Sequence, residues 1–268
     1  MKKTILITGS TDGIGLETAK MLAAEGHQLL IHGRSTDKLA RTQEQLAEIP
    51  NSVKTECYAA DLSKLQDVNA MATAIAQNHQ RLDVVINNAG VFNLANPVAE
   101  NGQDLRFVVN TLAPYLLTQK LLPLLDKSSR VVNLSSAAQA PVDLAALRGE
   151  IALDDGQAYA QSKLALTMWS RNMGLEMKDT GPVIIAVNPK SFLGSKMVKQ
   201  AYGVAGGDLS IGADVLSRAA LSDEFTKASG QYYDNDIGQF SSPNPDALDS
   251  AKCQPVINTI REMLKDLL

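Results

Sequence analysis

The 268-residue chain has little of several residue types on which whole classes of protein depend. It contains only two cysteines and three histidines, and none of them has the spacing of metal ligands or of a redox pair. We therefore expect no metal site, and we expect Cys57 and Cys253 to be separate reduced thiols. Aromatic residues make up only 4% of the chain, so the core should be aliphatic.

Charge of one sign and long apolar runs are also scarce. The formal net charge is -4 at pH 7, which leaves no basic field to attract nucleic acid or anionic lipid. The apolar run after Met1 ends within a few residues, which is too short for a signal peptide. With 45% hydrophobic and 20% charged residues, the composition is that of a soluble globular protein. We expect no nucleic-acid or membrane partner and a cytoplasmic location.

The chain does contain a repeated alternation of short apolar runs and longer amphipathic stretches. This pattern is typical of βα units that build a parallel sheet with helices on both faces. The length suits one α/β domain, residues 1–268, with a doubly wound sheet of about seven strands. We expect strands at 4–8, 28–32, 53–58, 82–87, 130–134, 183–188 and 230–233, and helices at 13–25, 37–48, 63–79, 104–125, 158–178, 212–221 and the C-terminus.

A glycine-rich segment follows the first expected strand and opens a helix. Its sequence is Thr8-Gly9-Ser10-Thr11-Asp12-Gly13-Ile14-Gly15. Gly9 suits a tight turn, Gly13 lets the backbone approach a pyrophosphate, and Gly15 lets helix and strand pack closely. Free N–H groups and the positive helix end then favour phosphate. Such turns also occur for geometry alone, but the strand–loop–helix context predicts a nucleotide site over these residues.

The second expected strand ends in His32-Gly33-Arg34, where a dinucleotide-binding sheet meets the adenosine ribose. A carboxylate at this position would bind a free 2'-hydroxyl, whereas an arginine offers a bidentate fork to a 2'-phosphate. Arg34 therefore favours NADP(H), and NAD(H) is kept as the alternative. A solvated surface arginine near Asp37 is the plainer interpretation of the same residue.

Tyr159 and Lys163 are four residues apart in a stretch of helical periodicity, so they lie on one helix face. A tyrosine with the usual pKa of ~10 shuttles protons poorly near neutral pH, and an adjacent ammonium favours the phenolate. Ser136 ends the fifth expected strand, at the sheet edge where ligands bind. It could donate a hydrogen bond to a substrate oxygen while Tyr159 transfers the proton, or it could merely begin a loop.

In their order along the chain, four motifs together resemble the short-chain dehydrogenase/reductase superfamily, over nearly the whole chain. They are Thr8-Gly9-x-x-x-Gly13-x-Gly15, Asn87-Asn88-Ala89-Gly90, Ser136 and Tyr159-x-x-x-Lys163. The resemblance implies a Rossmann-type fold and an NADP(H)-dependent enzyme that reduces a ketone or aldehyde, or oxidises an alcohol. Tyr159 would be its general acid/base.

The resemblance also assigns roles to single residues. Asn110 would complete a catalytic tetrad with Ser136, Tyr159 and Lys163 by holding a proton-relay water. Asp61 and Leu62 correspond to the adenine contact. The other implied cofactor contacts are Asn88, Ala89, Gly90, Tyr159, Lys163 and Pro189.

Two features resemble one branch of the superfamily, and one residue departs from the family pattern. Ser136 and Tyr159 are 23 positions apart, and the chain has a Ser-Gly-x-Tyr-Tyr segment from Ser229 to Tyr233; both resemble the retinol-dehydrogenase-like branch. Lys190 stands where the family usually has glycine after proline. Its side chain is expected to turn to solvent, or else to contact cofactor phosphate or narrow the substrate mouth.

The expected substrate is a small hydrophobic carbonyl compound or alcohol, because apolar residues populate the loops around the expected site. They are Phe92, Leu94, Leu153, Phe192, Leu193 and Met197, with Tyr202 nearby. The resemblance also implies a homodimer or homotetramer, built partly through the helices after the fourth and fifth strands. Two rival functions remain: a nucleotide-binding redox sensor without turnover, and an NAD-dependent alcohol dehydrogenase.

Overall fold

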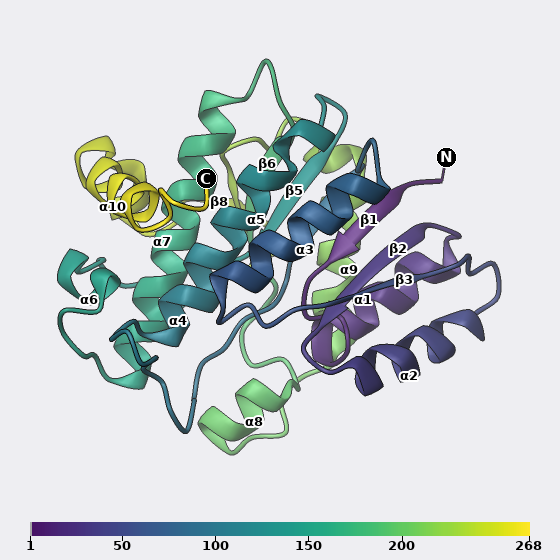
Figure 1. Cartoon of the computed structure of the whole chain (residues 1–268), viewed down its shortest axis with the longest axis horizontal. Helices are drawn as coiled ribbons and strands as arrows, with labels where there is room; N and C mark the ends of the chain where they lie inside the picture. The colour runs from purple at the N-terminus through teal and green to yellow at the C-terminus, as the bar shows by residue number, and fades with distance from the viewer. Residues whose placement is uncertain (1) are drawn as a thin grey trace.

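A twisted sheet of eight strands runs through the part of the chain that the computed structural model describes, residues 2–268 (Figure 1). Its order is β3-β2-β1-β4-β5-β6-β7-β8, and only β8 is antiparallel to its neighbour. The chain reverses direction across the sheet between β1 and β4, so the sheet is doubly wound as expected. The strands are β1 (Thr4–Ile7), β2 (Gln28–Gly33), β3 (Glu56–Ala59), β4 (Val84–Asn87), β5 (Arg130–Leu134), β6 (Val183–Asn188), β7 (Tyr232–Asp234) and β8 (Gln239–Ser241).

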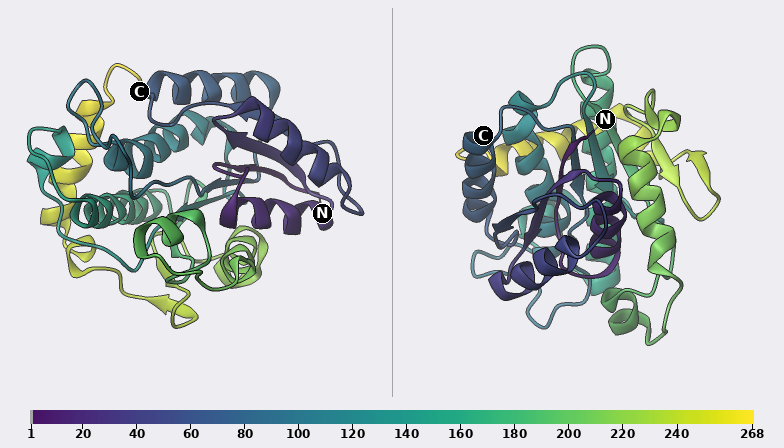
Figure 2. Two further views of the ribbon diagram at one scale, coloured as in Figure 1. Left: turned by 90° about the horizontal axis from the view of Figure 1, so that it is seen from below. Right: turned by 90° about the vertical axis from the view of Figure 1, so that its right-hand side faces the viewer.

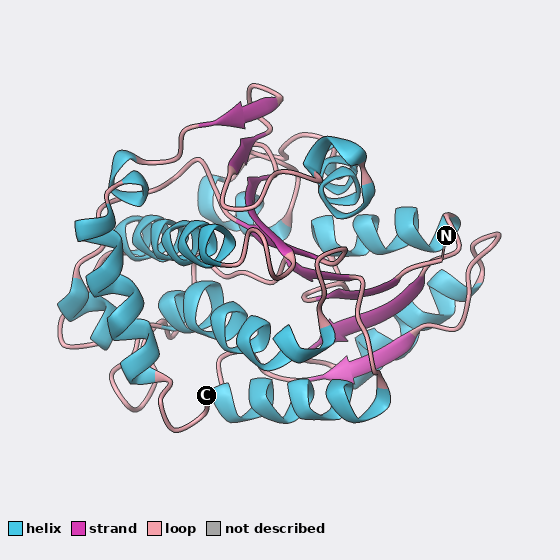
Figure 3. Ribbon diagram, turned by 90° about the horizontal axis from the view of Figure 1, so that it is seen from above, coloured by secondary structure: helices cyan, strands magenta, loops and turns pink. Residues whose placement is uncertain are grey.

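Helices cover both faces of the sheet (Figures 2 and 3). Successive side chains of a strand point to opposite faces, and in β1 Ile5 and Ile7 enter one core cluster while Leu6 enters the other. The first cluster lies under α1 (Gly13–Ala24), α2 (Thr36–Ala47) and α9 (Leu209–Leu221), the second under α3 (Leu65–Asn78), α5 (Ala113–Leu121) and α7 (Asp155–Glu176).

The expected helix over 104–125 is a composite of four pieces. They are α4 (Leu105–Phe107), a π-helical turn (Val108–Leu112), α5 and a 3-10 turn (Leu122–Leu124). Pro114 has no N–H for the carbonyl four residues earlier, and the N–H of Ala113 bonds to Val108, five residues back. The wider turn carries Asn110, and π-turns of this kind are frequent at functional sites.

Besides two 3-10 turns (Asp223–Phe225 and Pro245–Leu248), three short elements were not predicted: α6 (Leu144–Arg148), α8 (Lys196–Tyr202) and strand β8. Each is short, and the exposed edge strand β8 has no continuous apolar run to reveal it. The C-terminal helix α10 (Ser250–Met263) packs against α6 and α7, and Val256, Ile257 and Ile260 are buried there. No helix within residues 2–268 is both long and apolar enough to cross a bilayer.

Candidate active site

The glycine-rich loop lies between β1 and α1, at the carboxyl edge of the sheet. Gly9 has φ +65°, and a Cβ on it would lie 2.9 Å from the Cα of Ala89. A Cβ on Gly15 would collide with the backbone of Gly9 and the side chain of Asn88. Gly13 differs, because its Cβ would meet no atom nearer than Ser195 Cβ at 4.0 Å. Gly13 therefore keeps open the space above the loop, as a bound pyrophosphate requires.

The other loop residues face different neighbours. Ser10 is fully buried and its Oγ bonds to the main chain of His32, so its side chain holds the loop onto β2. Asp12 caps α1 by accepting the N–H of Gly13 at 2.9 Å and forms an ion pair with Lys196 of α8. Thr11 lies over Gly33 and Ile14 over Gly212 of α9.

The Asn87–Gly90 segment after β4 is tied directly to this loop. Asn88 Nδ2 donates to the carbonyl oxygens of Thr8 at 2.8 Å and Gly9 at 3.1 Å. The N–H groups of Asn88 and Ala89 both donate to Thr8 Oγ1, at 3.0 and 3.1 Å. Two of the motifs noted in the sequence therefore form one rigid unit.

The residues expected around the adenosine follow β2 and β3. Arg34 is exposed directly after β2, in a position to reach a phosphate in solvent. Asp61 accepts hydrogen bonds from the N–H of Ser63 at 3.1 Å and its hydroxyl at 2.8 Å, which fixes the loop after β3. Leu62 is buried in the core, so its side chain anchors the same loop.

Lys163 is a buried cation near the carboxyl edge of the sheet. Its side chain is almost fully enclosed, and Nζ donates to the main-chain oxygen of Leu134, at the end of β5, at 2.7 Å. Burial penalises the ammonium and lowers the pKa of Lys163 to about 8. A Cβ on Gly90 would lie 3.5 Å from Nζ and 3.3 Å from Asn110 Oδ1. Glycine at position 90 thus keeps the approach to both groups open.

Tyr159 lies one helical turn before Lys163 on α7. Lys163 Nζ is 5.7 Å from the centre of the Tyr159 ring, close enough for the ammonium to act on the phenol electrostatically. Phe92 packs against Tyr159, with ring centres 4.6 Å apart. The spacing noted in the sequence therefore produces a Tyr-Lys unit in a half-buried setting.

Asn110 is buried next to this unit. Its side-chain amide bonds to the N–H and C=O of Val91 at 2.8 and 2.9 Å and donates to Ser162 Oγ at 2.9 Å. Ser162 Oγ in turn donates to the carbonyl of Tyr159 at 2.7 Å. Asn110 therefore connects the loop after β4 to the helix that carries Tyr159. Its role in holding a relay water stays a prediction.

Of the two serines after β5, only one faces outward. Ser135 is buried and its hydroxyl lies 2.7 Å from Thr167 Oγ1. Ser136 is half-buried, and its Oγ accepts the N–H of Ala138 at 3.1 Å. Tyr232 donates to the carbonyl of Ser136 at 3.1 Å. The Ser-Gly-x-Tyr-Tyr segment thus supports the loop that presents Ser136, a role that the sequence motif did not reveal.

The loop after β6 departs from the usual backbone of its residues. Lys190 has φ 114° and Phe192 has φ 54°, a region that favours glycine. This explains why the family usually has glycine after the proline. Pro189 is buried and Lys190 is exposed. Whether Lys190 contacts cofactor phosphate or narrows the entrance to the substrate site stays a prediction.

The apolar residues expected around a substrate separate into two groups. Met197 Cε lies 3.9 Å from the Cβ position of Gly90, and Phe92 packs on Tyr159, so both reach the candidate site. Leu193 packs on Gly212 of α9, and Phe192 is exposed. The side chain of Tyr202 lies outside the described residues.

The comparisons with known proteins agree with this arrangement. A family model for short chain dehydrogenases matches residues 3–203. Human retinol dehydrogenase 13 is 28% identical over 275 residues, which cover 92% of this chain and 80% of the relative. A Shigella flexneri short-chain dehydrogenase, solved in complex with NADP, has a TM-score of 0.68 and 25% identity over 87% of this chain and 96% of its own. An uncharacterised protein from Mycobacterium paratuberculosis shares the fold, with a TM-score of 0.80 and 23% identity over 98% and 93% of the two chains.

The fold and the sites at its carboxyl edge define a nicotinamide-dependent oxidoreductase of the Rossmann type. The chain belongs to the short-chain dehydrogenase family and, within it, is similar to the retinol dehydrogenases.

Proposed function

We propose that the chain is an NADP(H)-dependent carbonyl reductase that interconverts a small hydrophobic ketone or aldehyde and its alcohol. The observation that carries the proposal is the Tyr159-Lys163 unit beside an open Gly90, at the same sheet edge as a glycine loop able to take a pyrophosphate. NADP(H), when bound, supplies or accepts the hydride. The space above Gly13 and the exposed Arg34 fit its phosphates.

In carbonyl reduction, Ser136 would donate a hydrogen bond to the substrate oxygen and Tyr159 would deliver the proton to the developing alkoxide. Lys163 would stabilise the resulting phenolate through its charge. Alcohol oxidation follows the reverse path, in which the Tyr159 phenolate accepts the hydroxyl proton. Phe92 and Met197 give the site apolar walls, which supports a hydrophobic substrate.

Two rival functions are weaker. A nucleotide-binding sensor would not need a buried lysine beside a tyrosine, and both are present. An NAD-dependent alcohol dehydrogenase would gain nothing from an exposed arginine after β2. NAD(H) remains the alternative cofactor.

We also propose a cytoplasmic protein that forms a homodimer or homotetramer. Helix α10 packs against α7, so a subunit contact through α7 is limited to the surface that α10 does not cover. Light scattering of the purified chain tests the proposed oligomeric state, and a monomer at micromolar concentration would contradict it.

The first experiment measures consumption of NADPH and NADH with a panel of aromatic and aliphatic ketones and aldehydes. We expect NADPH-dependent turnover, and we expect Tyr159→Phe to lower it by about 10²- to 10⁴-fold because the proton donor is lost. Arg34→Asp should move the preference toward NADH, because the carboxylate repels a 2'-phosphate and can bind a free 2'-hydroxyl.

Arg41→Asp is the matched control for Arg34→Asp, because it makes the same substitution at another exposed arginine, on α2. Cofactor binding without turnover on any carbonyl would favour the sensor. Turnover that prefers NADH in the unchanged chain would favour the NAD-dependent dehydrogenase.

A further inference from the structure

His32 lies at the carboxyl end of β2, against the glycine-rich loop, and is only 2% exposed. Its ring Nδ1 accepts the N–H of Gly9 at 3.0 Å, and Nε2 lies 3.1 Å from the carbonyl oxygen of Ala60. Its main-chain N–H donates to Ser10 Oγ at 3.0 Å, and its carbonyl accepts the N–H of Ser10 at 3.0 Å. All the polar atoms of this residue thus bond to loops at the carboxyl edge.

The two ring partners determine the protonation state of His32. The N–H of Gly9 can only donate and the carbonyl of Ala60 can only accept, so Nδ1 is unprotonated and Nε2 carries the hydrogen. A charged imidazolium would set one N–H against another at Gly9. Burial favours the same neutral ring and lowers the pKa of His32 to about 4. Of the nearby charges, Arg34 also favours the neutral form, and Asp61 opposes it.

The ring joins two loops that are far apart in the sequence. Gly9 makes the first turn of the phosphate loop, with φ +65°. Ala60 directly precedes Asp61 and Leu62, the expected adenine contact. A neutral imidazole therefore sets the spacing between the segments that face the pyrophosphate and the adenine.

We propose that His32 is a positioning residue that holds the phosphate loop and the adenine loop at the spacing required by the adenosine half of the cofactor. The inference rests on the proposed NADP(H) binding. Because His32 acts through the two loops and lies away from Tyr159, its loss weakens cofactor binding and leaves the hydride and proton transfers intact.

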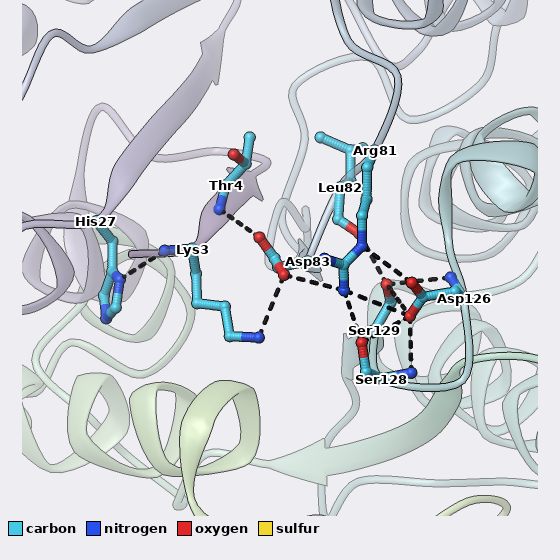
Figure 4. A network of polar contacts seen from close by, with 9 residues as sticks. All are labelled: Lys3, Thr4, His27, Arg81, Leu82, Asp83, Asp126, Ser128 and Ser129. Atoms are coloured by element: carbon cyan, nitrogen blue, oxygen red, sulfur yellow. Dashed lines mark hydrogen bonds and ion pairs between the residues drawn. The ribbon is translucent and has the colours of Figure 1, made fainter. Parts of the chain in front are cut away.

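His27 offers a matched control at the opposite end of the same strand. It is 7% exposed, and its Nδ1 accepts the N–H of Lys3 at 3.1 Å (Figure 4). His27→Phe therefore removes a buried histidine and a comparable main-chain hydrogen bond without touching either cofactor loop.

The test compares His32→Phe, His32→Asn and His27→Phe with the unchanged chain. Phenylalanine keeps a ring but removes both bonds, whereas the asparagine oxygen can still accept from Gly9. Calorimetry gives the Kd for NADPH and for 2',5'-ADP, and steady-state kinetics give KM for NADPH and kcat at saturation. We expect His32→Phe to raise both Kd values and the KM by at least about tenfold. We expect kcat to stay within about twofold.

His32→Asn should recover part of the affinity, and His27→Phe should bind both ligands like the unchanged chain. Unchanged affinity in a folded His32→Phe variant overturns the inference, as does an equal loss in His27→Phe or a fall in kcat without a change in KM. If His32→Phe does not fold, the Kd values of His32→Asn decide, and equality with the unchanged chain overturns the inference. An unchanged chain that binds neither NADPH nor NADH overturns the proposed function itself, which separates the two failures.

Discussion

The two edges of the sheet contain similar groups in opposite arrangements. At the amino edge, Asp83 accepts the N–H of Thr4 at 2.8 Å and pairs with Lys3 at 3.2 Å and Arg81 at 3.3 Å (Figure 4). At the carboxyl edge, the buried Lys163 bonds to a neutral main-chain oxygen. The charges of Lys3 and Arg81 are paired with carboxylates at the first edge, whereas the charge of Lys163 at the second edge remains available. This is the difference between a structural and a reactive cluster.

Each edge of the sheet also has a buried histidine, His27 at the amino edge and His32 at the carboxyl edge. Each accepts a main-chain N–H through Nδ1, His27 from Lys3 and His32 from Gly9. Only His32 bonds to loops with a glycine at positive φ and open space above them. The same local chemistry therefore stabilises the fold at one edge and shapes a candidate binding site at the other.

The largest expected effect on stability lies at the amino edge. Asp83→Ala leaves the N–H of Thr4 without its acceptor and Lys3 without its carboxylate, while Arg81 keeps Asp126. This should lower the free energy of unfolding by about 4 kcal/mol, most of it from the unsatisfied N–H. Turnover per folded molecule should not change. Urea unfolding followed by circular dichroism measures the loss, together with NADPH consumption at low temperature.

Asp126→Ala is its control, because this carboxylate belongs to the same network but is mostly exposed, and we expect a smaller loss. Equal losses of unfolding free energy in the two variants would show that the burial of Asp83 adds nothing to its contribution. A catalytic defect in folded Asp83→Ala would show that the two edges are not separate in function.

The next effect concerns stability in acid. His32 has a pKa of about 4 in the folded chain and ~6.5 when unfolded, so the unfolded state binds more protons between these values. Stability therefore falls as pH drops from about 6.5 to about 4, by about 3 kcal/mol in total. Urea midpoints across this pH range measure the loss, and the part due to His32 should vanish in His32→Asn. A slope that His32→Asn leaves unchanged would assign the acid sensitivity to other groups.

A smaller effect is expected in the pH dependence of turnover. Lys163 has a pKa of about 8 in the structure, so its ammonium is lost as pH rises above that value. Carbonyl reduction should fall about tenfold per pH unit on this limb, or about 1.4 kcal/mol. Asp126→Ala should keep the limb, because that residue is at the other edge. A rate that stays level to pH 10 would mean that the charge of Lys163 is not needed.

The central strands of the sheet, β1, β2, β4, β5 and β6, could be predicted because each is a short, mostly apolar run buried on both faces. Boundaries were less accurate: the expected strand 53–58 is Glu56–Ala59, and 230–233 is Tyr232–Asp234. The π-turn around Asn110 could not be predicted, because helical periodicity does not distinguish a bond of four residues from one of five. The edge strand β8 is only three residues long, which is too short for hydrophobic periodicity to indicate a strand.

The candidate site was partly visible in the sequence, because its motifs lie at the ends of successive strands. The supports of the site were not visible. Tyr232 reaches Ser136 from a distant segment, and the bonds of Asn110 to Val91 and Ser162 depend on tertiary contacts. His32 did leave a signal: a polar residue ends an otherwise apolar strand beside the glycine loop. Contacts between segments far apart in the sequence could not be predicted from motifs and hydrophobic periodicity alone.

The smallest expected effect concerns the loop after β6, where the carboxyl edge departs from the family pattern. Lys190 has φ 114°, which costs a non-glycine residue about 1 kcal/mol or more. Lys190→Gly removes that strain but adds ~0.5–1 kcal/mol of unfolded-state entropy, so stability should rise by less than about 1 kcal/mol. Thermal unfolding should move upward by at most ~2 °C.

Lys190→Ala separates the backbone from the side chain, because it removes the ammonium and keeps the unfavourable φ. Since Lys190 is exposed, both variants should turn over like the unchanged chain, and only Lys190→Gly should gain stability. If both variants raise the KM for NADPH equally, the ammonium binds cofactor phosphate. If both variants alter the KM for the carbonyl substrate, the Lys190 side chain narrows the entrance to the substrate site. In either case, the charge of Lys190 as well as its backbone conformation would contribute to the reactive carboxyl edge.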